Sequence, residues 1–64
     1  MSVRKVRDLI KTIEADGWYY YKTLGDHHHY KHSKKLGKVT IPGKHSDEVH
    51  PKTEKSILRQ AGLI

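Results

Sequence analysis

The fold of this chain is decided by one continuous stretch, Trp18-Tyr19-Tyr20-Tyr21-Lys22-Thr23-Leu24-Gly25-Asp26-His27-His28-His29-Tyr30-Lys31-His32. Its first seven residues are rich in aromatic and other strand-favouring side chains and carry no helix signal. Gly25-Asp26 is a turn signal, so residues 27–32 are expected to return as a second, antiparallel strand. The stretch therefore predicts a β-hairpin over residues 18–32.

Side chains alternate between the two faces of a strand, and this alternation divides the hairpin into two sets of residues. In the first strand, one face is expected to carry Trp18, Tyr20 and Leu24, and the other Tyr19, Tyr21 and Thr23. In the second strand, one face is expected to carry His28, Tyr30 and His32, and the other His27, His29 and Lys31. The neighbouring histidines therefore do not form one cluster.

The residues before the hairpin predict an amphipathic helix over residues 3–16. Apolar residues recur there at helical spacing, namely Val3, Val6, Leu9, Ile10 and Ile13. Ser2 is the expected N-cap, and Gly17 stands where the C′ glycine of a helix belongs.

The residues after the hairpin predict a short strand and a second helix. Residues 33–37 form a turn, residues 38–41 a third strand ended by Pro42-Gly43, and residues 43–50 a polar loop. His50-Pro51-Lys52-Thr53 opens the second helix, whose apolar face is Ile57, Leu58 and Ala61 and which ends at Gly62. The predicted class is α+β in the order α-β-β-β-α, a three-stranded antiparallel sheet with two helices on one face.

Length and composition limit what the chain can be. Its 64 residues are expected to form a single domain over residues 1–64. The absence of cysteine excludes disulfides and thiolate zinc sites. No apolar run is long enough to span a membrane, and no secretory signal is recognisable, so a cytoplasmic protein is expected.

The formal net charge of +6, from 13 Lys and Arg against 7 Asp and Glu, makes a dense positive field for so short a chain. A phosphate backbone is its most natural partner, because release of counterions drives such binding. The alternative is a surface that like charge merely keeps soluble.

Three adjacent histidines suggest a metal site, but their spacing argues against one. Neighbours in a strand point to opposite faces, so His27, His28 and His29 cannot all reach one ion. The pairs His27 with His29 and His28 with His32 remain, and no acidic cluster converges on either. We therefore expect no metal and no cofactor.

A general acid or base needs only one exposed histidine near cations, and His27 fits best because it follows the tight turn and projects from the open face. Lys22, Lys31 and Lys38 lie on neighbouring strands, where they would hold and neutralise a phosphate. RNA supplies its own nucleophile, the 2′-hydroxyl, so one histidine with several lysines is a conceivable minimal nuclease. The alternative is that His27 is only a polar residue of a hairpin.

The tyrosines of the first strand have two alternative interpretations, and the remaining histidines are assigned with them. Tyr19, Tyr21 and His29 would contact RNA, with the tyrosine rings stacked on bases. Equally, the tyrosines would pack across the strands against His27 and His29. His28 is expected to be structural, packed beside Tyr30 on the side that faces the core.

Several segments together resemble the HicA toxin family of mRNA interferases. They are Leu9-Ile10, Asp16-Gly17-Trp18, Gly25-x-His27-His28, Val39-Thr40-Ile41-Pro42 and Thr53-x-x-Ser56-Ile57-Leu58-Arg59-Gln60-Ala61-Gly62-Leu63. The resemblance spans nearly the whole chain in order and spacing. It implies an α-β-β-β-α fold similar to a double-stranded-RNA-binding domain, and ribosome-independent cleavage of mRNA.

The resemblance also implies roles for particular residues. The family's catalytic histidine corresponds to His27, with Gly25 as the turn residue and His28 as the second histidine. Asp26 stands where the family often has serine, and would either stabilise a His27 imidazolium or repel phosphate. Lys52-Thr53 replaces the frequent Gly-Thr. The implied partners are mRNA and a HicB-type antitoxin that covers His27.

Two other functions agree with the same residues. A non-catalytic RNA-binding module would keep the sheet and its basic surface and would bind RNA without cleaving it. A structural interaction protein would use the open face to meet a protein partner.

Overall fold

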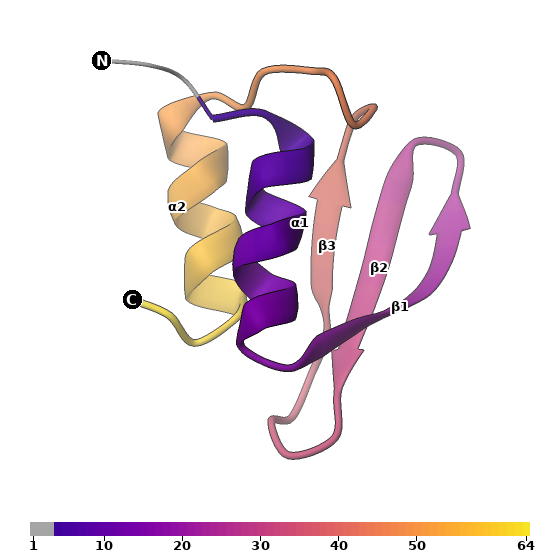
Figure 1. Ribbon diagram of the computed structural model, residues 1–64, viewed down its shortest axis with the longest axis vertical. Coiled ribbons are helices and arrows are strands. Elements are labelled where there is room, and N and C mark those ends of the chain that lie inside the picture. The colour runs from indigo at the N-terminus through magenta and orange to yellow at the C-terminus, as the bar shows by residue number, and fades with distance from the viewer. Residues whose placement is uncertain (1–3) are drawn as a thin grey trace.

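Two helices lie against one face of a three-stranded antiparallel sheet in the computed structural model, which describes residues 4–64 (Figure 1). The elements are α1 (Val6–Ala15), β1 (Trp18–Leu24), β2 (His27–His32), β3 (Val39–Pro42) and α2 (Pro51–Gln60). The strand order is β1-β2-β3, so β2 is central and carries most of the histidines. The predicted class, element order and hairpin are confirmed.

Helix α1 buries the predicted apolar side, Val6, Leu9, Ile10 and Ile13. It begins after Lys5, whose backbone N–H donates to Oδ2 of Asp8 at 3.0 Å. The expected N-cap Ser2 lies outside the described residues. Gly17 has a φ of 102°, a conformation that favours glycine, so the expected C′ glycine is confirmed.

A β-bulge changes the side-chain alternation in β1. Tyr20 pairs with Tyr30 and Lys22 pairs with His29, so Tyr21 is the extra residue between two regular pairs. Beyond the bulge, Thr23 is therefore on the side of the helices and Leu24 on the opposite side. The predicted faces of Thr23 and Leu24 were wrong because a bulge reverses the alternation that follows it. In β2 the predicted faces are confirmed.

The core lies between the sheet and the helices. Trp18, Tyr30, Val39 and Ile41 from the sheet are buried against apolar side chains of α1 and α2. Val49 is also buried, although it belongs to the segment predicted to be a wholly polar loop. That segment runs beside the start of α1, where the Val49 N–H donates to the Arg4 carbonyl at 2.8 Å.

Helix α2 begins as predicted, with Pro51 in its first turn and His50 as N-cap, whose Nδ1 accepts from the Lys52 N–H. Ile57 of the helix and Ala61, which follows it, are buried in the core. Within residues 4–64, neither helix has the length and apolarity that crossing a membrane requires.

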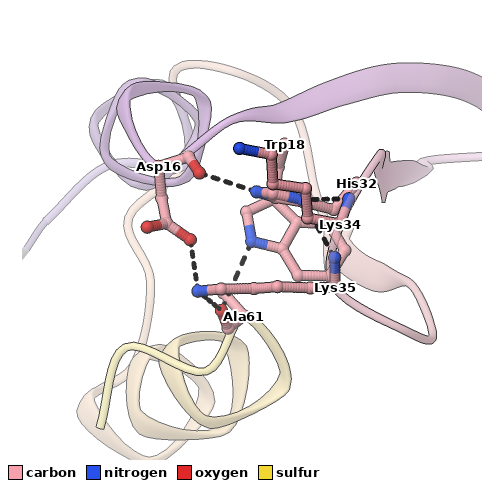
Figure 2. A network of polar contacts seen from close by, with 6 residues as sticks. All are labelled: Asp16, Trp18, His32, Lys34, Lys35 and Ala61. Carbon is pink, nitrogen blue, oxygen red and sulfur yellow. Dashed lines mark hydrogen bonds and ion pairs between the residues drawn. The ribbon is translucent and has the colours of Figure 1, made fainter.

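A network of polar contacts fixes one end of the hairpin, and we call it the clamp: Asp16, Trp18, His32, Lys34, Lys35 and Ala61 (Figure 2). Nε2 of His32 donates to the Asp16 carbonyl at 2.7 Å, and Nδ1 accepts from the backbone N–H groups of Lys34 and Lys35. The ring also meets Trp18 edge-on, with centroids 5.1 Å apart. Both nitrogens of His32 are thus occupied.

Lys35 links the clamp to α2. Its ammonium donates to the Asp16 carboxylate and to the Ala61 carbonyl, and the Trp18 indole N–H donates to the same carbonyl at 3.3 Å. Asp16 and Ala61 follow the ends of the two helices, so the clamp joins both helices to the hairpin (Figure 2).

The opposite end of the hairpin, residues 24–27, projects away from the helices, and we call it the turn end (Figure 1). Leu24 is 57% exposed there. The two ends of one hairpin therefore differ sharply in how firmly the rest of the molecule holds them.

Candidate active site on the open face of the sheet

The sheet surface opposite the helices, which we call the open face, gathers most of the predicted site residues. Cross-strand pairs place residues of β1, β2 and β3 side by side on it: Tyr19, Lys22, Leu24, His27, His29, Lys31 and Thr40. Tyr21 joins them from the bulge. The hairpin and β3 thus bring together on one surface residues that are far apart in the sequence.

His27 is positioned by the turn before it. Gly25 has a φ of 62°, as the first residue of a type II′ turn requires, and glycine adopts that angle without strain. The Asp26 carbonyl accepts from the Gly43 N–H at 2.8 Å, which ties the turn to the end of β3. The sequence therefore sets the start of β2, and with it the place of His27.

The His27 side chain is 56% exposed. Its Nε2 lies 3.7 Å from Oδ1 of Asp26, which is 69% exposed. That separation is too long for a hydrogen bond, so Asp26 acts on the ring only through its charge. The His27 ring is accordingly accessible from solvent.

His28 is on the helix side and is half-buried, as predicted, but hydrogen bonds rather than Tyr30 fix it. Nε2 donates to the Gly43 carbonyl at 2.7 Å, which leaves Nδ1 of the neutral ring to accept from the Thr23 hydroxyl at 3.1 Å. The Tyr20 hydroxyl lies 2.7 Å from the same Thr23 oxygen. His28 therefore supports the turn end through Thr23 and Gly43.

His29 lies on the open face as predicted, yet it is only 8% exposed. Nδ1 is 3.2 Å from the Thr40 hydroxyl of β3. Burial lowers the pKa of His29, and the positive charges of Lys38 and Lys22 lower it further. The sequence pattern placed this residue correctly but gave no sign of its burial.

The lysines and tyrosines of the open face contact one another. Lys31 Nζ lies 3.9 Å from the centroid of the Tyr21 ring, and Lys22 Nζ lies 5.4 Å from it. Tyr19 is paired with Lys31. The alternative of packing against His27 and His29 is therefore wrong for Tyr19, whose cross-strand neighbour is Lys31. Lys38 is exposed immediately before β3.

A hollow of about 320 Å³ lies beside the turn end, lined by residues that include Asp26, Gly43, Asp47, Glu48 and Thr53. Sequence reasoning missed this hollow, since Asp47 and Glu48 come from a segment that the pattern marked only as loop. Its carboxylates repel phosphate, whereas the lysines of the open face attract it. Within residues 4–64, no three histidine or carboxylate side chains gather as a metal site.

Residues 6–63 match the family model of the HicA toxin of bacterial toxin–antitoxin systems. The matched range contains every helix and strand, from α1 to α2. No curated protein matches the chain. The family resemblance noted in the sequence is thereby confirmed.

Proposed function

The chain belongs to the HicA toxin family, and from this membership we propose that it is a toxin that cleaves mRNA without the ribosome. The proposed reaction is metal-independent transesterification at a phosphodiester of RNA, with His27 as a proton-transfer group. The observation that carries the proposal is an exposed, unengaged histidine beside a face lined with lysines.

The choice of His27 follows from what occupies the other ring nitrogens of β2. His28 and His32 each use both nitrogens for contacts within the fold. In the described part of the chain, the ring of His27 makes no hydrogen bond, and its nearest charged group is Asp26. A proton-transfer group must reach its substrate, and an exposed ring meets that condition.

The lysines of the open face supply the charge that a phosphodiester needs. Lys22, Lys31 and Lys38 would bind the backbone and stabilise the extra negative charge of the pentacoordinate transition state. Tyr19 and Tyr21 are about half exposed, at 51% and 49%, so both rings are available to stack on bases. His29 would contribute to the same RNA-binding surface.

The remaining site residues would act through His27. Gly25 supplies the positive φ of the turn, and the Asp26 carbonyl holds the turn to Gly43. On the helix side of the sheet, His28 is hydrogen-bonded to the Gly43 carbonyl. In the proposed reaction the 2′-hydroxyl of RNA is the nucleophile. His27 would either take its proton or give one to the leaving 5′-oxygen.

Membership of the family implies an antitoxin partner, and we propose a HicB-type protein that covers His27. Leu24, Tyr19 and Tyr21 expose apolar surface beside the lysines of the open face. An acidic and apolar partner segment would complement that surface and exclude RNA. Action on mRNA would place the toxin in the cytoplasm.

The proposal is tested by incubating RNA in EDTA with the wild type, His27→Ala and His45→Ala. His45 is exposed in the loop after β3, with its ring centroid 5.3 Å from that of His28, and has no proposed role in proton transfer, so its variant is the control for loss of a histidine. We expect cleavage by the wild type and the control, and at least about a 100-fold loss with His27→Ala.

Three results would contradict the proposal in different ways. Equal cleavage by His27→Ala would remove this residue from the mechanism. Loss of wild-type cleavage in EDTA would indicate a metal. Salt-sensitive RNA binding without any cleavage by the wild type would support the non-catalytic RNA-binding module instead.

A further inference from the structure

We propose that His29 is the second proton-transfer group of this site, the base that takes the proton from the 2′-hydroxyl, while His27 protonates the leaving 5′-oxygen. The inference rests on the proposed function. It addresses a gap in that proposal, because transesterification moves two protons and one histidine does not readily move both at once.

The spacing along β2 allows the rings of His27 and His29 to contact the same phosphodiester. His27 and His29 are two residues apart on β2 and project from the same face, so their Cα atoms are separated by about 6.6 Å. Hydrogen bonds to oxygen span about 2.8 Å each. A phosphodiester between the two rings can therefore have its 2′-oxygen at one ring and its 5′-oxygen at the other.

The burial of His29 leaves one nitrogen accessible. Nδ1 is 3.2 Å from the Thr40 hydroxyl, whereas Nε2 has no hydrogen-bond partner among residues 4–64. Every buried side-chain nitrogen and oxygen of the described residues has a partner, so Nε2 cannot be fully buried. The ring is therefore largely enclosed by its neighbours, while Nε2 keeps contact with solvent on a residue that is 8% exposed.

The groups around His29 favour its neutral form. Lys22 approaches from β1, Lys38 from the residue before β3, and His27 and His28 from β2 itself, while Thr40 of β3 is uncharged. Burial is the largest cause of the lowered pKa, and these charges add to it. A histidine that stays neutral near pH 7 is suited to accept a proton.

His27 has the opposite surroundings. Its ring is exposed, and its Nε2 lies 3.7 Å from Oδ1 of Asp26. Two neighbouring histidines in different environments are thereby suited to different roles, one as base and one as acid.

Nε2 of His29 takes the 2′-hydroxyl proton as the 2′-oxygen forms a bond to phosphorus. The bond from phosphorus to the 5′-oxygen breaks, and the His27 imidazolium gives its proton to that oxygen. The products are a 2′,3′-cyclic phosphate and a 5′-hydroxyl, with His29 protonated and His27 neutral. Lys22 and Lys31 neutralise the phosphoryl oxygens.

A substrate whose 5′-bridging oxygen is replaced by sulfur separates the two roles. A thiolate leaves without a proton, because thiols are far more acidic than alcohols, so this substrate needs a base but no acid. Cleavage of normal and 5′-thio RNA would be measured for the wild type, His27→Gln, His29→Gln, His29→Asn and the control His45→Gln.

On normal RNA we expect both His27→Gln and the His29 variants to be slower by about 100-fold or more. On 5′-thio RNA, His27→Gln should recover to within a few-fold of the wild type, whereas both His29 variants should remain slow. In His29→Asn, the side-chain amide can still reach the Thr40 hydroxyl, so this contact is kept while the imidazole is lost. Thermal unfolding of each variant would verify that it is folded. Like the wild type, His45→Gln should cleave both substrates.

Other outcomes overturn the inference, and they differ from a failure of the proposed function. If folded His29 variants cleave normal RNA as fast as the wild type, or recover on 5′-thio RNA, His29 is not the base although the nuclease assignment stands. If wild-type protein cleaves neither substrate, the proposed function fails and this inference with it.

Discussion

The clamp end and the turn end of the β1–β2 hairpin use the same residue type in opposite ways. At the clamp end, His32 has its Nε2 on the Asp16 carbonyl, its Nδ1 on two backbone N–H groups, and its ring against Trp18 (Figure 2). At the turn end, His27 has only the Asp26 carboxylate nearby, at 3.7 Å.

The difference shows that hydrogen-bond partners, and not the abundance of histidine, separate the structural residues of this strand from the candidate catalytic ones. A ring with both nitrogens engaged in the fold can transfer a proton only by giving up a contact. A ring exposed at a turn gives up nothing. His29 is intermediate, with Nδ1 beside the Thr40 hydroxyl and with Nε2 lacking a hydrogen-bond partner among residues 4–64.

The largest expected difference between the two ends is in how a histidine substitution changes folding stability. His32→Ala should lower the free energy of unfolding by about 2 kcal/mol, because it leaves the Asp16 carbonyl and two backbone N–H groups without their partner. For a domain of this size, that corresponds to a fall of about 10 °C in Tm. His27→Ala should change the stability by less than about 0.5 kcal/mol.

Thermal and urea unfolding of the two variants, with His45→Ala as an exposed control, would measure these differences. Equal losses of stability in His27→Ala and His32→Ala would show that the turn end is held as firmly as the clamp end. The proposed division of the histidines would then be untenable.

Much of the hairpin could be predicted from the sequence, because its signals are local. The turn signal Gly25-Asp26 and the alternation of β2 place His27, His29 and Lys31 on one face, as the structure has them. The beginning of α2 and the C′ position of Gly17 follow equally from neighbouring residues.

What the sequence could not predict depends on contacts between distant residues. The bulge at Tyr21 is a mismatch between two strands, and no residue of β1 alone signals it. Likewise, Val49 is buried because its segment lies beside Arg4, and His32 is held by Asp16, which comes 16 residues earlier. The burial of His29 likewise follows from the packing of three strands.

A smaller effect on RNA binding distinguishes the lysines of the open face from Lys35 of the clamp. Under the proposed function, Lys31→Ala should reduce the slope of log Kd against log salt for single-stranded RNA by about 0.7, because one phosphate contact is lost. Lys35→Met should leave that slope unchanged, since the Lys35 ammonium is bound to the Asp16 carboxylate and the Ala61 carbonyl.

Binding titrations at several salt concentrations, made with non-cleaving His27→Ala as the background, would measure both slopes. An equal reduction by Lys35→Met would mean that the clamp contacts RNA. No reduction by Lys31→Ala would place the phosphate path elsewhere than beside Tyr21.

The smallest effect expected is the dependence of the clamp on pH, because the Asp16–Lys35 pair is partly open to solvent, with 28% and 37% of the side chains exposed. The hydrogen bond from Lys35 holds the pKa of Asp16 below its ordinary value of 3.8, against the opposing effect of burial. A carboxylate whose pKa is lower in the folded state stabilises the fold above the unfolded pKa. Its contribution is lost as the pH falls from about 3.8 through the lower folded value.

Removing either partner should therefore flatten the stability profile in acid and leave the turn end unaffected. Unfolding of the wild type, Asp16→Asn, Lys35→Met and the double variant would be measured between pH 6 and 2. The wild type should lose more stability than any variant over this range, and the double variant should resemble Asp16→Asn. If the wild type and Asp16→Asn lose the same amount, the pair does not hold the clamp. The firmness of that end would then rest on His32 and Trp18 alone.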